Sequence, residues 1–151
     1  MARSYSVQKS GAVGSASYHQ LAIYMATAAG VRPKIFEFAI GSSASPADQA
    51  SRYLITRSST GAPTGGANPA IGPLDFADPA ALATSYDSAT GGETMSTVLM
   101  MFSVNLRATF RWVAAPTKEF VIPNTQYAGC GLQVAAQTAA YNVDLTLMWE
   151  E

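Results

Sequence analysis

The sequence predicts an all-β fold: a single-domain antiparallel β-sandwich or jelly roll of about eight strands, with one long loop and a short helix. Apolar residues recur at every second position through most of the chain, which is the period of a half-buried strand. A length of 151 residues suits one domain with its own core and is short for two. Strands that each bury one face pack most simply as two sheets, apolar face to apolar face.

The clearest strand signal lies between Val98 and Val113. Every even position from Val98 to Trp112 is apolar, and a helix would scatter these residues around its axis. This pattern predicts one long strand, or two strand segments joined by a bend. From residue 103 onward the odd positions carry polar side chains: Ser103, Asn105, Arg107, Thr109 and Arg111.

Shorter stretches of alternation predict the other strands. Residues 1–14 contain few apolar side chains apart from Tyr5 and Val7, which predicts an N-terminal arm that reaches a neighbouring subunit, or an edge strand. Residues 15–151 form the predicted sandwich domain. The remaining strands are expected at residues 3–9, 18–26, 34–40, 51–57, 118–122, 128–136 and 141–150.

A long loop is expected over residues 58–96, because Gly, Pro, Ser and Thr dominate its first part. Within it, Asp78 is a good N-cap and Pro79 suits the first helical position, which predicts the short helix over residues 78–83. A connection this long in a compact domain often contacts a partner, and a disordered surface excursion is the alternative. The apolar anchors for such a contact are Ile71, Leu74, Phe76, Leu82 and Tyr86.

Groups for catalysis are scarce. The chain has one histidine and one cysteine, which excludes a disulfide within the chain and a metal site built from several such ligands. His19 is expected to be a half-buried structural residue, and Cys130 a small core residue. Glu37 and Glu93 stand in no suggestive context, although a carboxylate pair for glycoside hydrolysis stays open. The sequence therefore predicts a protein that is not an enzyme and has no catalytic residue, cofactor or metal.

The chain carries few charges: 13% of its residues are charged, and nine Lys and Arg balance ten Asp and Glu. Without a basic surplus, no nucleic-acid partner is predicted. No apolar run is long enough for a membrane helix, so no membrane partner is expected. A surface this poor in charge is easier to understand if partner proteins cover much of it. The alternative is a surface kept soluble by its hydroxyl side chains.

Two pairs of residues in the segment 98–113 predict where such a partner binds. Arg107 and Arg111 stand on its polar face within reach of a partner carboxylate, although a solvated sheet face explains each of them taken alone. Leu99 and Met101 lie on the same face, which predicts that this part of the strand is covered on both sides. The predicted interface residues are Tyr5, Leu74, Phe76, Leu99, Met101, Arg107 and Arg111.

Three segments carry a resemblance to a known family: Asn105–Pro116, Lys34–Gly41 and Asp78–Ala81. They resemble small virion proteins of tailed bacteriophages, and within that group the jelly-roll capsid decoration, or cement, proteins. The resemblance implies a homo-oligomer, commonly a homotrimer, that is made in the cytoplasm of a bacterial host. It also implies a place on the outer capsid surface of the virion, where the protein binds the major capsid protein and stabilises contacts between its copies.

Two other kinds of function stay open. A jelly roll with exposed Tyr and Trp could be a carbohydrate-binding, head-fibre or adhesion module that stacks sugar rings on aromatic side chains. The predicted inward positions of Trp112 and Trp149 weaken that interpretation. A tail or neck structural component would share the composition of a decoration protein.

Overall fold

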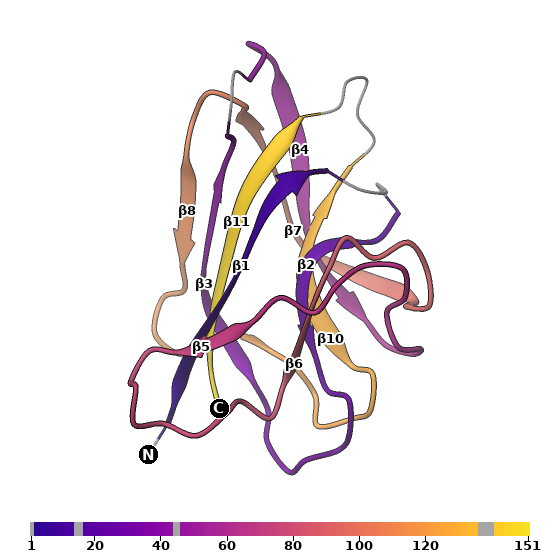
Figure 1. Ribbon diagram of the computed structural model, residues 1–151, viewed down its shortest axis with the longest axis vertical. Coiled ribbons are helices and arrows are strands. Elements are labelled where there is room, and N and C mark those ends of the chain that lie inside the picture. The colour runs from indigo at the N-terminus through magenta and orange to yellow at the C-terminus, as the bar shows by residue number, and fades with distance from the viewer. Residues whose placement is uncertain (1, 14–16, 44–45, 136–140) are drawn as a thin grey trace.

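The computed structural model describes residues 2–13, 17–43, 46–135 and 141–151. In this part of the chain all regular structure is β-strand, arranged as two antiparallel sheets that face each other (Figure 1). The predicted β-sandwich is therefore confirmed. Every strand expected from the sequence has a counterpart, although residues 1, 14 and 136 of the predicted segments lie outside the described residues.

The first sheet has the strand order β5-β1-β11-β3-β8, and β9 pairs with β3 beside this path. The second sheet has the order β6-β2-β10-β4-β7. Long connections therefore place strands that are distant in the sequence side by side. The strands are β1 (Ser4–Ala12), β2 (His19–Tyr24), β3 (Lys34–Gly41), β4 (Ala50–Ser58), β5 (Ile71–Pro73), β6 (Thr84–Asp87), β7 (Met95–Asn105), β8 (Phe110–Val113), β9 (Phe120–Val121), β10 (Gly129–Val134) and β11 (Asn142–Glu150).

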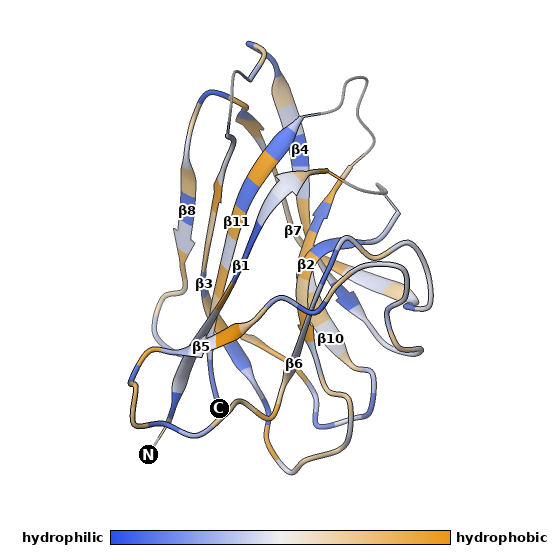
Figure 2. Ribbon diagram, in the orientation of Figure 1, coloured by the Kyte–Doolittle hydropathy of each residue, from blue (hydrophilic) through white to orange (hydrophobic). Residues whose placement is uncertain are grey.

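The core lies between the two sheets and is built from the apolar faces of their strands. Along β11 the inward residues Val143, Leu145 and Leu147 are buried, and the residues between them are more exposed. Figure 2 shows this alternation as orange and blue bands along β11. Cys130 of β10 belongs to the same core, as expected, and burial raises the pKa of its thiol to about 12. The thiol is therefore protonated and unreactive at neutral pH.

The strongest strand signal of the sequence corresponds to two strands, β7 and β8, which a turn joins and which lie in opposite sheets. The single apolar face predicted for them does not extend over all of β7. Ile55 of β4 pairs with Met100, and Thr56 pairs with Val98, so Leu99 is an extra residue, a β-bulge. The alternation of inward and outward side chains along β7 is reversed at this bulge. Val98 is therefore half exposed, whereas Leu99 packs against the core.

Residues 58–96 are not a single loop. They contain β5 and β6, which are edge strands of the first and the second sheet. Because β6 and β7 form opposite edges of the second sheet, the segment 88–94 has to cross that sheet to connect them. The long connection is thus tied to both sheets.

The prediction of a helix over residues 78–83 is wrong, because the described residues contain no helix. The N–H groups of Leu82 and Ala83 donate to the two carboxylate oxygens of Glu151, each at 2.8 Å, and not to carbonyl groups one turn back. A single helical turn is costly to nucleate. Hydrogen bonds to a carboxylate from the far end of the chain replace it.

The N-terminal segment, expected as an arm or an edge strand, is part of the first sheet. β1 pairs with β11 along its whole length and with β5 over Tyr5–Val7. Tyr5 is 1% exposed, and its ring stacks on Trp149 with the ring centroids 5.6 Å apart. Tyr5 is therefore a core residue of this fold and does not present its ring to a partner.

Candidate docking surface and a buried polar cluster

The loop 74–83, between β5 and β6, exposes large apolar side chains. Phe76 is 99% exposed, Leu74 is 53% exposed and Leu82 is 49% exposed. A single exposed leucine is ordinary on a protein surface, but a whole phenyl ring in water forgoes the burial of a large apolar area. Three such side chains within one loop therefore mark it as a candidate docking surface. Leu74 and Phe76 were predicted as interface residues from the sequence.

A tight turn holds Phe76 at the tip of this loop. The carboxylate of Asp75 accepts a hydrogen bond from the N–H of Ala77 at 3.0 Å, and its carbonyl accepts one from the N–H of Asp78 at 3.0 Å. Aspartate favours such turns because its short side chain can bind the backbone two residues on. The turn fixes the backbone that carries the phenyl ring.

The two ends of the chain hold the loop in place. The N–H of Leu74 donates to the carbonyl of Ser4 at 2.8 Å, and the hydroxyl of Tyr5 donates to the carbonyl of Pro79 at 3.1 Å. Figure 1 shows both termini beside this loop. An ion pair between Arg3 and Asp78, 3.9 Å apart, is exposed and adds little.

Glu151 closes the other end of the loop. Besides the N–H groups of Leu82 and Ala83, its carboxylate accepts a hydrogen bond from Nε1 of Trp149 at 3.1 Å. The indole is fully buried, so it anchors this carboxylate to the core. A loop held in this way loses little conformational entropy when a partner binds it.

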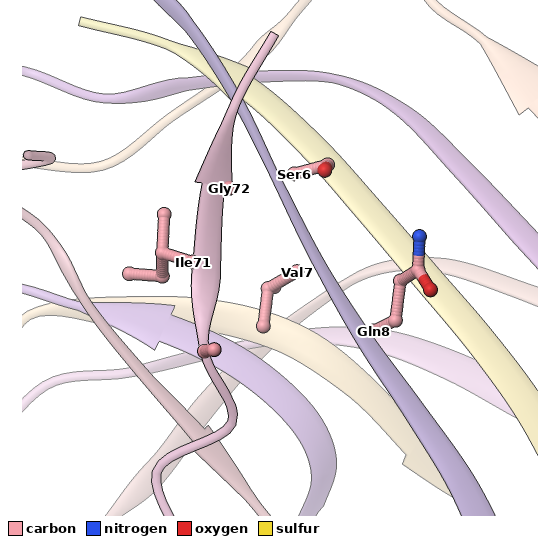
Figure 3. Close-up of a pocket in the computed structure, with 6 residues that line it drawn as sticks. Ser6, Val7, Gln8, Ile71 and Gly72 are labelled. Carbon is pink, nitrogen blue, oxygen red and sulfur yellow. The ribbon is translucent and has the colours of Figure 1, made fainter. Parts of the chain in front are cut away.

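Two hollows border this region. One, of about 340 Å³, lies beside the turn and is lined by Ala2, Ser4, Leu74, Asp75 and Asp78. The other, of about 410 Å³, lies where β5 runs along β1 (Figure 3) and has no charged residue in its lining, which is Ser6, Val7, Gln8, Ala70, Ile71 and Gly72. Asp75 and Asp78 are the charged residues in the lining of the first hollow.

The structure separates Leu99 from Met101. Met101 is 62% exposed on β7, but Leu99 packs against the core because it is the bulged residue. The prediction that both lie on one covered face is therefore wrong. β7 lies at the edge of the second sheet, and Met101 remains a candidate contact on it.

The two arginines also lie apart. Arg107 belongs to the turn after β7, where its guanidinium lies 3.8 Å from the carboxylate of Asp48. Arg111 is on β8, and its guanidinium makes two hydrogen bonds, of 2.6 and 2.8 Å, with the carboxylate of Glu37 on β3. These bonds hold the pKa of Glu37 below its ordinary value, against partial burial. Arg111 therefore has a partner within its own chain.

Polar residues gather in a different place, on the outer face of the second sheet beneath the segment 88–94. We call this group the buried cluster: His19 on β2, Thr56 on β4, Gln133 on β10, and Glu93 from the crossing segment. His19 is 1%, Thr56 3% and Glu93 6% exposed. A β-bulge in β2 creates this position. Leu21 pairs with Leu132 and His19 pairs with Gln133, so Gln20 is the extra residue of the bulge and the side chain of His19 is turned away from the core. His19 is thus wholly buried, and not half-buried as expected.

The buried cluster is joined by a chain of short contacts. Nδ1 of His19 lies 2.7 Å from Oε2 of Glu93, and the backbone N–H of His19 donates to Oε1 of Glu93 at 2.8 Å. Nε2 of His19 lies 2.9 Å from Oγ1 of Thr56 and 3.0 Å from its carbonyl oxygen. Oγ1 of Thr56 donates to Oε1 of Gln133 at 3.4 Å. Burial raises the pKa of Glu93, but its hydrogen bonds with His19 and the electrostatic attraction between the two groups outweigh this effect, so the pKa of Glu93 lies below its ordinary value.

Gly131 lets these groups meet. β10 lies between β2 and β4, and Gly131 pairs with Ala22 on one side and with Thr56 on the other. A Cβ atom at Gly131 would lie 2.4 Å from the Cβ of Ala22, so no larger residue fits. Because β10 carries no side chain there, His19 reaches across it to Thr56.

Lys9 makes a further buried polar contact, which links β1 of the first sheet to β2 of the second. Its side chain is buried, and Nζ donates to Oε1 of Gln20 at 3.2 Å and to Oγ of Ser88 at 2.5 Å. Burial lowers the pKa of Lys9, although the charge of Asp87 opposes this. The sequence indicated neither this contact nor the role of Glu93, because their partners are far apart along the chain.

The described residues contain no group of three or more His, Cys, Asp and Glu side chains placed to hold a metal ion. Among the same residues no helix is long and apolar enough to cross a membrane. The chain matches no family model, no curated protein and no solved structure. The candidate docking surface and the buried cluster are therefore the features of this chain that bear on its function.

Proposed function

We propose that this chain is a structural virion protein, a capsid decoration or cement protein that binds the outer surface of a tailed-phage head and stabilises contacts between major capsid proteins. The observation that carries the proposal is the full exposure of Phe76 on a turn that the rest of the chain holds in place. Such an anchor needs an apolar pocket on a partner. The resemblance to decoration proteins supplies the kind of partner.

The strand order supports the same proposal. We infer a jelly roll from the order β1-β11-β3-β8 in one sheet and β2-β10-β4-β7 in the other, since successive strands from β1 to β4 alternate between the sheets. In this scheme β5, β6 and β9 are additions to the eight strands. The connection from β4 to β7, which carries β5 and β6, then forms the part of the molecule that meets the capsid.

The low charge of the chain supports a partner that covers its surface. Aromatic anchors of this kind dominate binding energies, and truncation of one costs about 2–4 kcal/mol when the partner encloses it. Asp75 and Asp78 flank Phe76, so the partner pocket carries basic side chains at its rim. A homotrimer on the capsid would repeat the contact three times and add avidity.

The sugar-binding alternative gains no support from the tryptophans. Trp149 is fully buried, and Trp112 stacks between Phe38 and Phe120 at centroid distances of 5.0 and 4.7 Å. Neither ring stands free as a flat platform for a sugar.

The proposal is tested by sedimenting the purified protein with heads of the phage that encodes it. We expect wild-type protein to pellet with heads, and Phe76→Asp to bind at least about 30-fold more weakly, because a carboxylate cannot enter an apolar pocket. Val113→Asp is the matched control, since Val113 is 52% exposed on β8, away from the loop. Phe76→Asp should unfold within about 0.5 kcal/mol of wild type, and Val113→Asp should lose up to about 1 kcal/mol because its carboxylate lies opposite Glu37 on β3.

Binding to isolated tails or necks and not to heads would contradict the decoration role. Equal loss of binding in both variants would contradict the assignment of the loop as the contact. Light scattering of the wild-type protein over a dilution series would report whether the trimer exists before the protein binds to heads.

A further inference from the structure

The buried cluster has the parts of an acyl-transfer site. The distance from the Thr56 hydroxyl to His19, 2.9 Å, and that from His19 to Glu93, 2.7 Å, fall in the range of a nucleophile, its base and the carboxylate that orients the base. Glu93, with its lowered pKa, is ionised at neutral pH and keeps a proton on Nδ1 of His19. In the structure the Thr56 hydroxyl donates to Oε1 of Gln133. When it rotates about its Cβ–Oγ1 bond it donates to Nε2 of His19 instead, which is then able to accept its proton.

An acyl group stands beside the nucleophile. Oγ1 of Thr56 lies 3.4 Å from Oε1 of Gln133, so the carboxamide carbonyl of Gln133 is within contact distance of the hydroxyl. The two residues occupy neighbouring strands, β4 and β10, whose pairing holds them in this position. Because Thr56 and His19 are buried, no solvent-borne substrate reaches the hydroxyl.

We propose that Thr56 and Gln133 become joined by an ester bond that the folded chain forms by itself. His19 is the catalytic base, and Glu93 is the positioning residue that orients it. The reaction occurs once per chain, and it does not rest on the proposed function.

The step balances without any co-reactant. The hydroxyl proton of Thr56 passes to Nε2 of His19, and Oγ1 forms a bond to Cδ of Gln133. The bond from Cδ to Nε2 of Gln133 then breaks, and the proton on His19 goes to the leaving nitrogen, which departs as ammonia. The carbonyl oxygen of Thr56, 3.0 Å from Nε2 of His19, accepts a hydrogen bond from the imidazolium between the two proton transfers.

The surroundings favour the product. Gln133 is half-buried, so ammonia has a route to solvent, where dilution and protonation prevent its return. Thr56 and His19 are almost wholly buried, so water that would hydrolyse the ester is kept away. The bond would tie together two central strands of the second sheet.

The test is the mass of the denatured wild-type protein. We expect it to lie about 17 Da, one ammonia, below the mass given by the sequence, once N-terminal processing is measured on the same sample. Thr56→Val and Gln133→Met should each have the full mass of their own sequences. Thr56→Ser should keep the loss, and Gln126→Met, which changes an exposed glutamine, should keep it as a matched control.

Peptide mapping places the bond. Trypsin should release residues 53–57 joined to residues 119–151, and hydroxylamine should separate them because it cleaves esters. A wild-type chain of full mass would overturn the proposal. A loss of ammonia that survives Thr56→Val would also overturn it, and a cross-link between Lys9 and Gln20 would assign the loss to the buried lysine.

The role of Glu93 has its own readout. During cell-free synthesis, the mass loss should appear at least about tenfold more slowly in Glu93→Gln than in wild type, and Glu93→Asp should restore part of the rate. Equal rates in wild type and Glu93→Gln would show that Glu93 only ties the crossing segment to the sheet.

Discussion

Two parts of the same connection, residues 58–96, reverse the usual distribution of side chains in opposite ways. The loop 74–83 holds Phe76, an apolar side chain, wholly in solvent, whereas the segment 88–94 places Glu93, a carboxylate, almost wholly out of it. Both positions are maintained by specific hydrogen bonds, to Glu151 in the first case and to His19 in the second. The comparison teaches that exposure of apolar area points to a partner, and burial of a charged group points to chemistry or to a structural tie.

The largest effect is expected from removing the buried carboxylate. Glu93→Ala leaves His19 without its partner inside the protein, which should cost about 3–5 kcal/mol in the free energy of unfolding. Urea denaturation measures this cost, with Thr56→Val as the parent chain so that no cross-link contributes. Arg107→Ala, which breaks an ion pair with Asp48 that is exposed on both sides, is the control and should cost about 1 kcal/mol or less. Equal costs in the two variants would show that the buried pair of Glu93 and His19 stabilises the fold no more than an exposed ion pair does.

Acid should also expose the role of Glu93. Its pKa in the folded state lies below its ordinary value of 4.5, so its contribution to stability is complete above that pH. The contribution is lost as the pH falls below 4.5 towards the folded-state pKa. We expect the free energy of unfolding to decline more steeply with acid in the parent chain than in Glu93→Gln, measured by denaturant titrations at successive pH values. Parallel declines would contradict a lowered pKa at Glu93.

A smaller effect is expected at the anchor of the exposed loop. Glu151→Gln keeps the shape of the side chain but removes the charge that binds the N–H groups of Leu82 and Ala83, and it should cost about 1–2 kcal/mol. Because the loop then has to be ordered on binding, affinity for heads should fall as well. Glu119→Gln is the control, since this half-buried side chain receives a local hydrogen bond from the backbone N–H of Thr117 and lies outside the loop. A variant of Glu151 that binds heads as tightly as wild type would show that the loop needs no preorganisation.

The sequence predicted the strands well because alternation is a local property of a half-buried sheet. It failed where a distant residue decides the local structure. The helix expected over residues 78–83 does not form because the N–H of Leu82 donates to the carboxylate of Glu151, which lies 69 positions further along the chain. The face assigned to Leu99 fails because the bulge is defined by pairing with β4.

The candidate sites divide in the same way. Leu74 and Phe76 could be predicted as contacts, because apolar residues in a stretch rich in Gly and Pro are visible in the sequence. The partnership of His19 and Glu93 could not, because 74 positions separate them and only the fold brings them together. The glycines of β10 were the available signal, since a strand without side chains leaves space for its neighbours.

Hydrogen exchange of the wild-type protein, free and bound to phage heads, tests the central claim most directly. We predict that amides of the loop 74–83 gain protection on binding, while amides of the segment 88–94 exchange slowly in both states. Binding that leaves the exchange of 74–83 unchanged would contradict the assignment of this loop as the docking surface.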